Sequence, residues 1–425
     1  MNPRRPPQLR AALSHPRPLI VLFRYCGYWK NDVPHGLGTF HCKKGTVYTG
    51  EYREGLKIDG AGEFTSTHGH KFAGMFENVT LSEGPNKGFK GFVRVDGDGK
   101  MHFVSGHVYE GQWSNETEHG QGEMTYRNGD IYTGQWVEGK RSGSGRIAYN
   151  NDLMDGVADG KGDTYTGSWL EDARANGFGK MEYGHDDIYE GQWVNDIQCG
   201  EGKMSYAIGD VYEGGWKENL RHGKGKQVYK NGDVYDGLWE DGVRCGMGAH
   251  LYKAKNDLYT GPWVKDKRAD AIGDMAYGNG DHYKGMWVKD VKCGQGKMDF
   301  ANGDKYDGDH DADKANGHGK MAYANGDHYE GDWEDGHNHG HGTMVYANGD
   351  IYTGEFEISA RVDGPGSSIL SESGDDFAGY FVMEKRHGHG VQKFDDGEFY
   401  DGEWVDDKME GMGTLTYVNG NCFTG

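Results

Sequence analysis

The chain of 425 residues contains 74 glycines but only 9 prolines, an unusual balance for a globular protein. Because 46 Lys and Arg stand against 67 Asp and Glu, the net charge is −21, which disfavours nucleic acid and anionic lipid as partners. The longest apolar run, Pro18–Phe23, is far too short to span a bilayer. We therefore expect no transmembrane helix and no nucleic acid partner, and we expect protein partners with basic surfaces.

Residues 1–24 form a basic tail rich in proline and arginine. No acidic residue precedes Asp32, which is the charge pattern of an organelle transit peptide. Prolines in the tail would break the amphipathic helix that such a peptide needs. We interpret residues 1–24 as a disordered tail, with mitochondrial or other organelle import as the alternative.

An aromatic-x-Gly-x-aromatic pattern recurs along the rest of the chain. Its first aromatic residue returns at a nearly constant spacing, apart from two longer intervals, from Phe72 to Tyr109 and from Tyr132 to Tyr165. A fixed period of about 23 residues indicates repeated supersecondary units. The sixteen anchors are Tyr25, Tyr48, Phe72, Tyr109, Tyr132, Tyr165, Tyr189, Tyr212, Tyr235, Tyr259, Tyr283, Tyr306, Tyr329, Tyr352, Phe377 and Tyr400.

A second ring follows four residues after each anchor in almost every unit. All eleven tryptophans occupy this place, and Tyr52, Phe76, Phe356 and Phe381 occupy it in four other units. His310 stands there in the remaining unit, so it alone departs from a large aromatic side chain.

Each unit reads as one β-hairpin. Apolar and polar residues alternate in both halves of a unit, which is typical of strands. Six second strands close with Asn-Gly-Asp, and Asn-Gly between alternating segments predicts a hairpin turn. The Gly-x-Gly pair of the second strand would give a Tyr or Trp ring a place to lie. The sequence therefore predicts an all-β fold, an elongated single-layer antiparallel β-hairpin repeat ribbon of about sixteen repeats, stabilised by the stacking of neighbours.

We place the repeat array at residues 25–425, with insertions near residues 77–106 and 150–162. Extra residues in a repeat array usually form loops on one face. The second insertion brings Asp152, Asp155 and Asp159 close to Asp163, and we interpret it as an exposed acidic tongue. The pattern also departs at Asp270–Gly273, where DAIG replaces the expected Gly-x-Gly.

The run YEGDWEDGHNHGHGTMVYANGD at Tyr329–Asp350 resembles the MORN repeat, the membrane occupation and recognition nexus motif. The resemblance covers Tyr25–Gly425. It implies an antiparallel β-ribbon scaffold, similar to those of radial spoke heads, of the protist cytoskeleton and of membrane junctions. We therefore expect a non-catalytic scaffold of a cytoskeletal or ciliary assembly, in the cytoplasm on the cytoskeleton or the axoneme.

The family's name implies an alternative, which is a peripheral membrane adaptor that binds phosphoinositide or other anionic lipid headgroups. The net charge of −21 argues against it, because we expect the Lys and Arg clusters that attract anionic lipids to be confined to residues 1–24.

His337, His339 and His341 crowd among glycines in the quoted run. Gly340 and Gly342 lead into a strand and not into a helix N-terminus, which argues against a phosphate-binding loop. No carboxylate or thiol at ligand spacing completes a zinc shell, so we interpret the histidines as a plain connector. We expect no catalytic residues, no cofactor and no metal, and hence no enzyme.

Alternating aspartates surround His310. Asp307, Asp309, Asp311 and Asp313 would share one face of a continuing strand, and their spacing does not match an EF-hand loop. We interpret these five residues as a candidate docking site for a basic partner. The missing aromatic residue at His310 also predicts a local bend or docking point, with faster hydrogen exchange than in neighbouring units.

Two further expectations concern cysteines and the end of the array. Cys199, Cys245 and Cys293 recur in every second unit, which separates successive members by roughly 19 Å at about 4.8 Å per strand, so we expect reduced thiols.

The array ends at Gly425 without a capping repeat, which predicts an open strand edge for a homodimer or another assembly.

Overall fold

A computed structural model describes residues 23–42, 45–80, 90–150 and 162–425. These residues form 34 strands and no helix, and the strands belong to one open sheet. Among them there is consequently no helix able to cross a membrane. The predicted antiparallel hairpin repeat ribbon is confirmed. Most of the basic tail and parts of both insertions, including Asp152, Asp155 and Asp159, lie outside the described residues.

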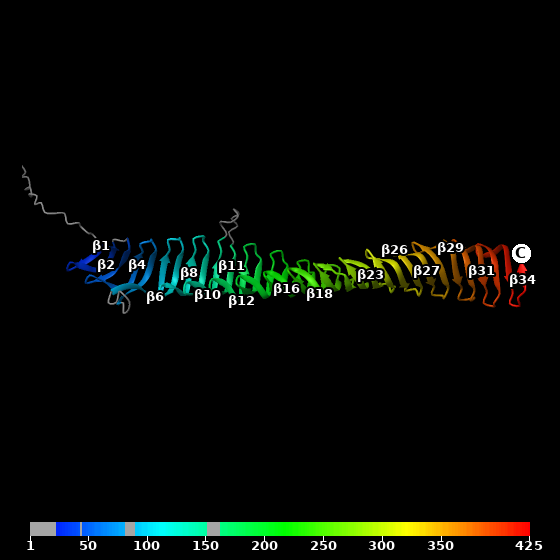
Figure 1. Ribbon diagram of the computed structural model, residues 1–425, viewed down its shortest axis with the longest axis horizontal. Helices are drawn as coiled ribbons and strands as arrows, with labels where there is room; N and C mark the ends of the chain where they lie inside the picture. Colours follow the sequence, from blue (N-terminus) through cyan, green and yellow to red (C-terminus); the bar gives the residue numbers. More distant parts are fainter. Residues whose placement is uncertain (1–22, 43–44, 81–89, 151–161) are drawn as a thin grey trace, which may run out of the picture. The chain divides into compact units, whose positions relative to one another are not determined.

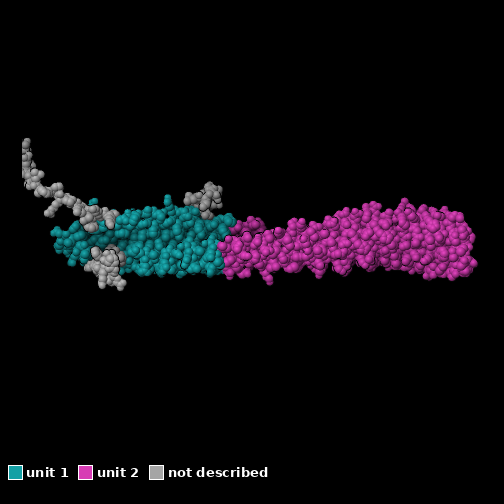
Figure 2. Space-filling view, in the orientation of Figure 1, with its two compact units in different colours: residues 1–186, 193–196 teal, residues 187–192, 197–425 magenta. Residues whose placement is uncertain are grey.

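The chain divides into two compact units, and in each of them consecutive hairpins follow one another in sequence order (Figures 1 and 2). Unit 1 comprises residues 1–186 and 193–196, and unit 2 comprises residues 187–192 and 197–425.

The strands of unit 1 are β1 Phe23–Lys30, β2 Val33–Cys42, β3 Val47–Arg53, β4 Leu56–Thr65, β5 Lys71–Thr80, β6 Lys90–His102, β7 Val108–Ser114, β8 Thr117–Thr125, β9 Ile131–Val137, β10 Lys140–Ala148, β11 Thr164–Leu170 and β12 Ala173–Glu182. Strand β13 Ile188–Val194 has residues in both units. The strands of unit 2 are β14 Ile197–Ser205, β15 Val211–Lys217, β16 Leu220–Val228, β17 Val234–Glu240, β18 Val243–Tyr252, β19 Asp257–Val264, β20 Lys267–Arg268, β21 Ala271–Ala276, β22 His282–Val288, β23 Val291–Asp299, β24 Lys305–Asp311, β25 Lys314–Ala322, β26 His328–Glu334, β27 His337–Val345, β28 Ile351–Glu357, β29 Ala360–Ile369, β30 Asp376–Val382, β31 Lys385–Lys393, β32 Phe399–Val405, β33 Lys408–Thr416 and β34 Cys422–Thr424.

Two kinds of turn alternate along the sheet. Glu218 and Asn219, between β15 and β16, both have left-handed φ angles of 51° and 65°, as a tight two-residue hairpin turn requires. The Asn-Gly turn differs from this type. Tyr229 N–H donates to Asp233 O at 2.9 Å and Gly232 N–H donates to Tyr229 O at 2.8 Å, which gives a three-residue loop closed by a left-handed glycine. The predicted Asn-Gly turn therefore joins successive hairpins.

The aspartate that follows each Asn-Gly holds neighbouring turns together. Asp233 Oδ1 accepts the N–H of Lys253 at 2.7 Å in the next turn along. Asp281 and Asp304 bind Ala301 and Ala324 in the same way, both at 2.8 Å. These bonds form a ladder along one edge of the sheet, which gives the recurrent aspartate a structural role.

Each anchor ring lies on a pair of glycines. A Cβ atom placed on Gly296 would lie 2.5 Å from Tyr283 Oη and 2.6 Å from a ring carbon, and the same ring covers Gly285. Gly294, the first glycine of this Gly-x-Gly, instead has a left-handed φ of 68° at a shift of strand register. The expectation that both glycines of the pair support a ring is therefore corrected: the first forms a β-bulge.

The rings also link one hairpin to the next. Trp287 packs edge-to-face on Tyr283 of its own hairpin at 5.4 Å and on Tyr259 of the preceding hairpin at 5.6 Å between ring centroids.

His310 takes the place of the second ring in its own hairpin. Its ring centroid lies 5.0 Å from that of Tyr283 and 5.1 Å from that of Tyr306, and the residue is only 5% exposed. Burial lowers its pKa, so the imidazole is held neutral. The register on both sides of β24 matches that of neighbouring hairpins, so His310 preserves the strand pairing.

Replacement of Gly296 by alanine should push the added methyl group into the Tyr283 ring. We expect the variant to lose about 1–3 kcal/mol of unfolding free energy, as overpacked cores do. Gly364→Ala is the matched control, because a Cβ atom at Gly364 meets no heavy atom within 4 Å. Urea unfolding followed by circular dichroism measures both, and equal stability of the two variants would contradict the ring-on-glycine packing.

Candidate functional site: a cation row on the aromatic face

The sheet has an aromatic face, which carries the buried rings, and an outer face with the alternate residues. In ten hairpins a Lys or Arg on the aromatic face pairs across the hairpin with the second ring position. The members of this cation row are Lys57, Arg94, Arg141, Arg174, Arg221, Arg244, Arg268, Lys292, Arg361 and Arg386. The expectation that cations cluster only in residues 1–24 is therefore wrong.

Most arginines of the row are held between a ring and an aspartate. The Arg268 guanidinium lies 4.0 Å from the ring centroid of Trp287, which belongs to the next hairpin. Its Nε donates to Asp290 Oδ1 at 3.3 Å, and its Nη2 donates to the Asp290 backbone oxygen at 2.8 Å. The stacking is a cation–π contact, and the aspartate also fixes the plane of the guanidinium. The same arrangement occurs at Arg141 with Asp172, Arg174 with Asp196, Arg244 with Asp266 and Arg386 with Asp407.

The remaining guanidinium nitrogen, Nη1, has an acceptor within some hairpins. Arg221 Nη1 donates to Gln227 Oε1 at 3.0 Å, and Arg386 Nη1 donates to Gln392 Oε1 at 2.7 Å. At Arg244 the acceptor is His250 Nδ1, at 2.9 Å.

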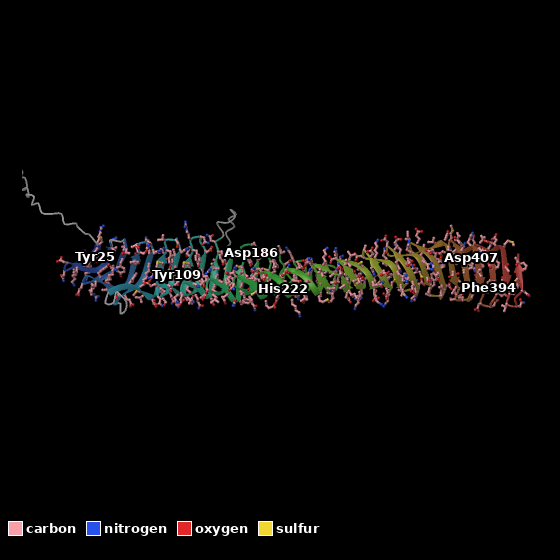
Figure 3. The ribbon with its side chains drawn as sticks, viewed as in Figure 1. Tyr25, Tyr109, Asp186, His222, Phe394 and Asp407 are labelled. Carbon is pink, nitrogen blue, oxygen red and sulfur yellow. The ribbon has the colours of Figure 1, made fainter. Side chains whose placement is uncertain are left out.

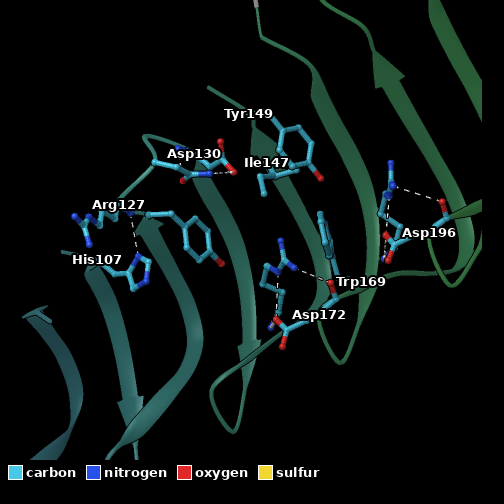
Figure 4. A pocket seen from close by; sticks show the side chains of 12 residues that line it. His107, Arg127, Asp130, Ile147, Tyr149, Trp169, Asp172 and Asp196 are labelled. Atoms are coloured by element: carbon cyan, nitrogen blue, oxygen red, sulfur yellow. Dashed lines mark hydrogen bonds and ion pairs between the residues drawn. The ribbon is translucent and has the colours of Figure 1, made fainter. Parts of the chain in front are cut away.

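In other hairpins the residue at this place is apolar and offers no acceptor. The pairs are Arg141 with Ile147, Arg174 with Met181, and Arg268 with Met275. The aromatic face is hollowed beside these arginines. A hollow of about 830 Å³ lies at Arg141 and Arg174 in unit 1 (Figure 4), and another of about 530 Å³ lies at Arg268 in unit 2.

Tyrosines complete both hollows. Tyr126 and Tyr149 line the first, and Tyr252 and Tyr277 line the second. Burial raises the pKa of all four phenols, so they remain protonated donors at neutral pH. Guanidinium and phenol donors above an apolar floor suit a ligand that carries hydrogen-bond acceptors.

The aspartates singled out in the sequence lie at and after β24. Asp307, Asp309 and Asp311 share its outer face, whereas Asp313 lies in the following turn. Asp307 is 2.7 Å from Lys297 Nζ, and Asp313 Oδ1 accepts the Lys292 N–H at 2.9 Å. His310 lies on the aromatic face, so the structure does not bring these five residues to one surface.

The three clustered histidines have separate partners. His339 Nε2 lies 3.0 Å from Glu334, and His341 Nδ1 lies 3.4 Å from Glu355. His337 Nδ1 lies 3.4 Å from the Ser359 hydroxyl. Within the described ranges, no group of three or more His, Cys, Asp or Glu side chains is arranged to hold a metal ion.

His250 should make stability depend on pH. Arg244 can only donate, so His250 Nδ1 must accept and the ring must be neutral. Burial, helped by Arg244, lowers the His250 pKa to about 4, whereas an unfolded histidine has a pKa of about 6.5. The stabilisation of the fold by neutral His250 is therefore present above pH ~6.5 and is lost as the pH falls towards 4.

The substitution His250→Gln should reduce the loss of stability at low pH. A glutamine does not titrate, and Gln227 and Gln392 accept the arginine hydrogen bond at the equivalent position of other hairpins. We expect a smaller drop in the urea midpoint between pH 7 and pH 5 than in the wild type. The exposed His328→Gln serves as the control. An unchanged pH dependence in the His250 variant would show that this histidine is not the titrating group.

The comparisons with known proteins identify the repeat. A family model described as the MORN repeat matches eleven segments of the chain. They are residues 25–47, 109–131, 132–154, 189–211, 212–234, 235–253, 283–305, 306–328, 329–351, 377–399 and 400–422. No curated protein matches the chain.

Solved structures show only distant likeness. The TCP domain of SAS-4 (dCPAP) of Drosophila melanogaster, in complex with a proline-rich motif of Ana2 (dSTIL), is 16% identical, with 37% of this chain and 84% of that chain covered and a TM-score of 0.25. The TCP10c domain of Drosophila melanogaster Sas-4 is 15% identical, with 37% and 93% covered and a TM-score of 0.23. A mutant of the TCP10 domain of Danio rerio CPAP is 13% identical, with 52% and 96% covered and a TM-score of 0.20. The repeat matches span more than half of the sequence, and the chain belongs to the MORN repeat family.

Proposed function

We propose that the chain is a non-catalytic scaffold that docks basic protein partners within a cytoskeletal or ciliary assembly. The MORN family and a repeated β-sheet are typical of non-enzymatic scaffolds. One observation carries the proposal of basic partners. Residues 305–357 contain twelve Asp and Glu against three Lys and Arg, a local net charge of −9.

The outer face of this segment repeats its carboxylates from hairpin to hairpin. Polar side chains fringe the ribbon of each unit (Figure 3). Asp307, Glu330 and Glu355 alternate with buried residues on β24, β26 and β28. Lys320 Nζ lies 2.8 Å from Glu330 Oε1, but both side chains are more than half exposed, so water screens this pair. A basic surface with matching spacing would meet several carboxylates at once, which favours fast and selective association.

Charge reversal on this surface tests the proposal. The triple variant Asp311→Lys, Glu334→Lys and Glu357→Lys should lose its protein neighbours in proximity labelling of the tagged full-length chain in its own cell. The control variant Glu190→Lys, Glu213→Lys and Asp236→Lys changes the charge equally on other outer-face positions. Cytoskeletal or axonemal neighbours that are lost only in the first variant would support the proposal. If both variants label the same set of neighbouring proteins, the proposal is contradicted.

A specific observation favours membrane association as the second candidate. Residues 217–297 contain fifteen Lys and Arg against eleven Asp and Glu, so this segment has a net charge of +4 in an acidic chain. Its outer face carries Met247 and Ile272, which are 60% and 62% exposed, and the register places them beside Pro262 and Met286. Apolar side chains among lysines are typical of surfaces that bind anionic membranes.

Vesicle sedimentation tests the second candidate. If the chain binds membranes, it should sediment with phosphatidylserine vesicles. The double variant Met247→Glu, Ile272→Glu should not sediment with them. Leu37→Glu is the matched control, because Leu37 is 65% exposed at the same place of another hairpin. Absence of wild-type binding at low ionic strength would exclude the candidate.

A further inference from the structure

Two hairpins of unit 1 lack an aromatic residue immediately before the inter-hairpin turn, at Cys42 and at Ser66. The residue before the inter-hairpin turn is aromatic in most hairpins, as at Tyr126, Tyr149, Tyr206, Tyr229, Tyr252, Tyr277, Tyr323, Tyr346 and Tyr417, and as at Phe103, Phe300 and Phe394. Ser66 has the same backbone role: its N–H donates to His70 O at 2.8 Å, and its carbonyl accepts from Gly69 N–H at 3.0 Å. The hydroxyl accepts the His70 N–H at 3.1 Å. A serine in place of tyrosine leaves the space of a phenol ring unfilled.

A hollow of about 480 Å³ lies at this place, and we call it the Ser66 hollow. Its apolar lining consists almost entirely of phenylalanine and tryptophan rings, whereas tyrosines line the hollows at Arg141 and Arg268. The rings that line it are Phe64, Phe72, Phe76, Phe103 and Trp113. Edge-to-face contacts are the favoured arrangement of aromatic rings, so a further ring would find partners on several sides.

Arg94 gives the hollow an unused donor. Its guanidinium lies 4.8 Å from the Phe72 ring centroid and 4.9 Å from that of Trp113. Nη2 donates to the Glu116 backbone oxygen at 3.2 Å, but Nη1 is buried without a hydrogen-bond partner. A buried N–H that lacks an acceptor is costly, so a ligand that supplies one gains this free energy on binding.

Other charged groups of the hollow permit a carboxylate there. Lys57 also lines it, and it adds a second cation. Glu116 and Glu118 are the acidic groups of the lining. Burial raises the pKa of Glu118, because the surroundings disfavour its charged form.

We propose that the Ser66 hollow binds an aromatic side chain of a partner polypeptide that carries a carboxylate on the adjacent residue. The ring takes the place of the missing tyrosine, and the carboxylate accepts the N–H of Arg94 Nη1. The occupant is a polypeptide because cations and aromatic residues continue along the same face at Arg141 and Tyr149. The hollow is on the aromatic face of its hairpins, whereas the carboxylates of residues 305–357 are on the outer face of theirs, so this site goes beyond the proposed function.

A ¹⁹F NMR titration of the full-length chain tests the site. The probe is the blocked tetrapeptide acetyl-Gly-Phe-Glu-Gly-amide with a 4-fluorinated ring. We expect it to bind the wild type about tenfold more tightly than the Gln analogue, because the Gln amide oxygen can accept the hydrogen bond from Arg94 but lacks the negative charge that strengthens it. The analogue with alanine in place of phenylalanine, followed as a competitor, should not displace the probe.

Two variants locate the binding. Ser66→Tyr introduces the tyrosine that most other hairpins have at this position, so it should fill the hollow and abolish binding. Ser168→Tyr on the outer face should not change the binding. Arg94→Gln should make the Glu and Gln peptides bind equally, which tests the carboxylate contact even if the Ser66 variant is poorly folded. Undiminished binding to Ser66→Tyr, or displacement by the alanine analogue, would overturn the proposal. Equally tight binding of N-acetyl-4-fluorophenylalanine would overturn a polypeptide as the occupant.

Discussion

An aromatic ring that lies on two glycines is the interaction on which the rest of the structure depends. The Tyr283 ring occupies the space above Gly285 and Gly296, and no side chain larger than hydrogen fits beneath it. Because the ring is supported from one side by backbone, a single layer of sheet buries it without a second layer. The Trp287 ring then shields it from one side and reaches the preceding Tyr259 from the other. Each hairpin is therefore completed by its neighbour.

Polar bonds along the edges keep the hairpins in register with this packing. The aspartate after Asn-Gly accepts a backbone N–H from the next turn, as Asp281 does from Ala301. At the opposite ends of the strands, Asp290 accepts the backbone N–H of Arg268 at 3.0 Å and also binds its guanidinium. The stacking of Arg268 on Trp287 joins this edge to the aromatic core. The many charged residues of the repeat thus have structural partners, and function depends on the places where the pattern changes.

Much of the fold follows from the sequence because the periodic residues contact residues at fixed distances along the chain. The spacing of Tyr283 and Trp287 reveals the strand, the period and the buried face together. Features that depend on backbone conformation were less accessible: the pattern does not show that Gly294 bends the chain while Gly296 supports a ring. The two-residue turns vary too much in sequence to be recognised, since Ala312 and Asp313 occupy one of them.

The candidate sites were less predictable than the fold. Arg268 stacks on Trp287 of the next hairpin, so its role is invisible when one repeat is considered alone. A cation five residues after most tryptophans was nevertheless a usable signal. The Ser66 hollow results from one absent ring, which a search for recurring residues passes over. Asp307, Asp309 and Asp311 alternate along β24, but Asp313 lies in the turn that follows, and the same alternation places His310 on the other face.

The central claim is that rings shared between hairpins stabilise the sheet, and hydrogen exchange of the variant Trp333→Ala tests it most directly. Trp333 packs on Tyr306 of the preceding hairpin at 5.0 Å and on Tyr329 of its own at 5.4 Å, and its Nε1 donates to Gly319 O at 3.2 Å. Amide protection should therefore fall in β24 to β27 and remain unchanged in β28 and β29. Loss of protection confined to β26 and β27 would contradict the claim, because each hairpin would then be stable independently of its neighbour.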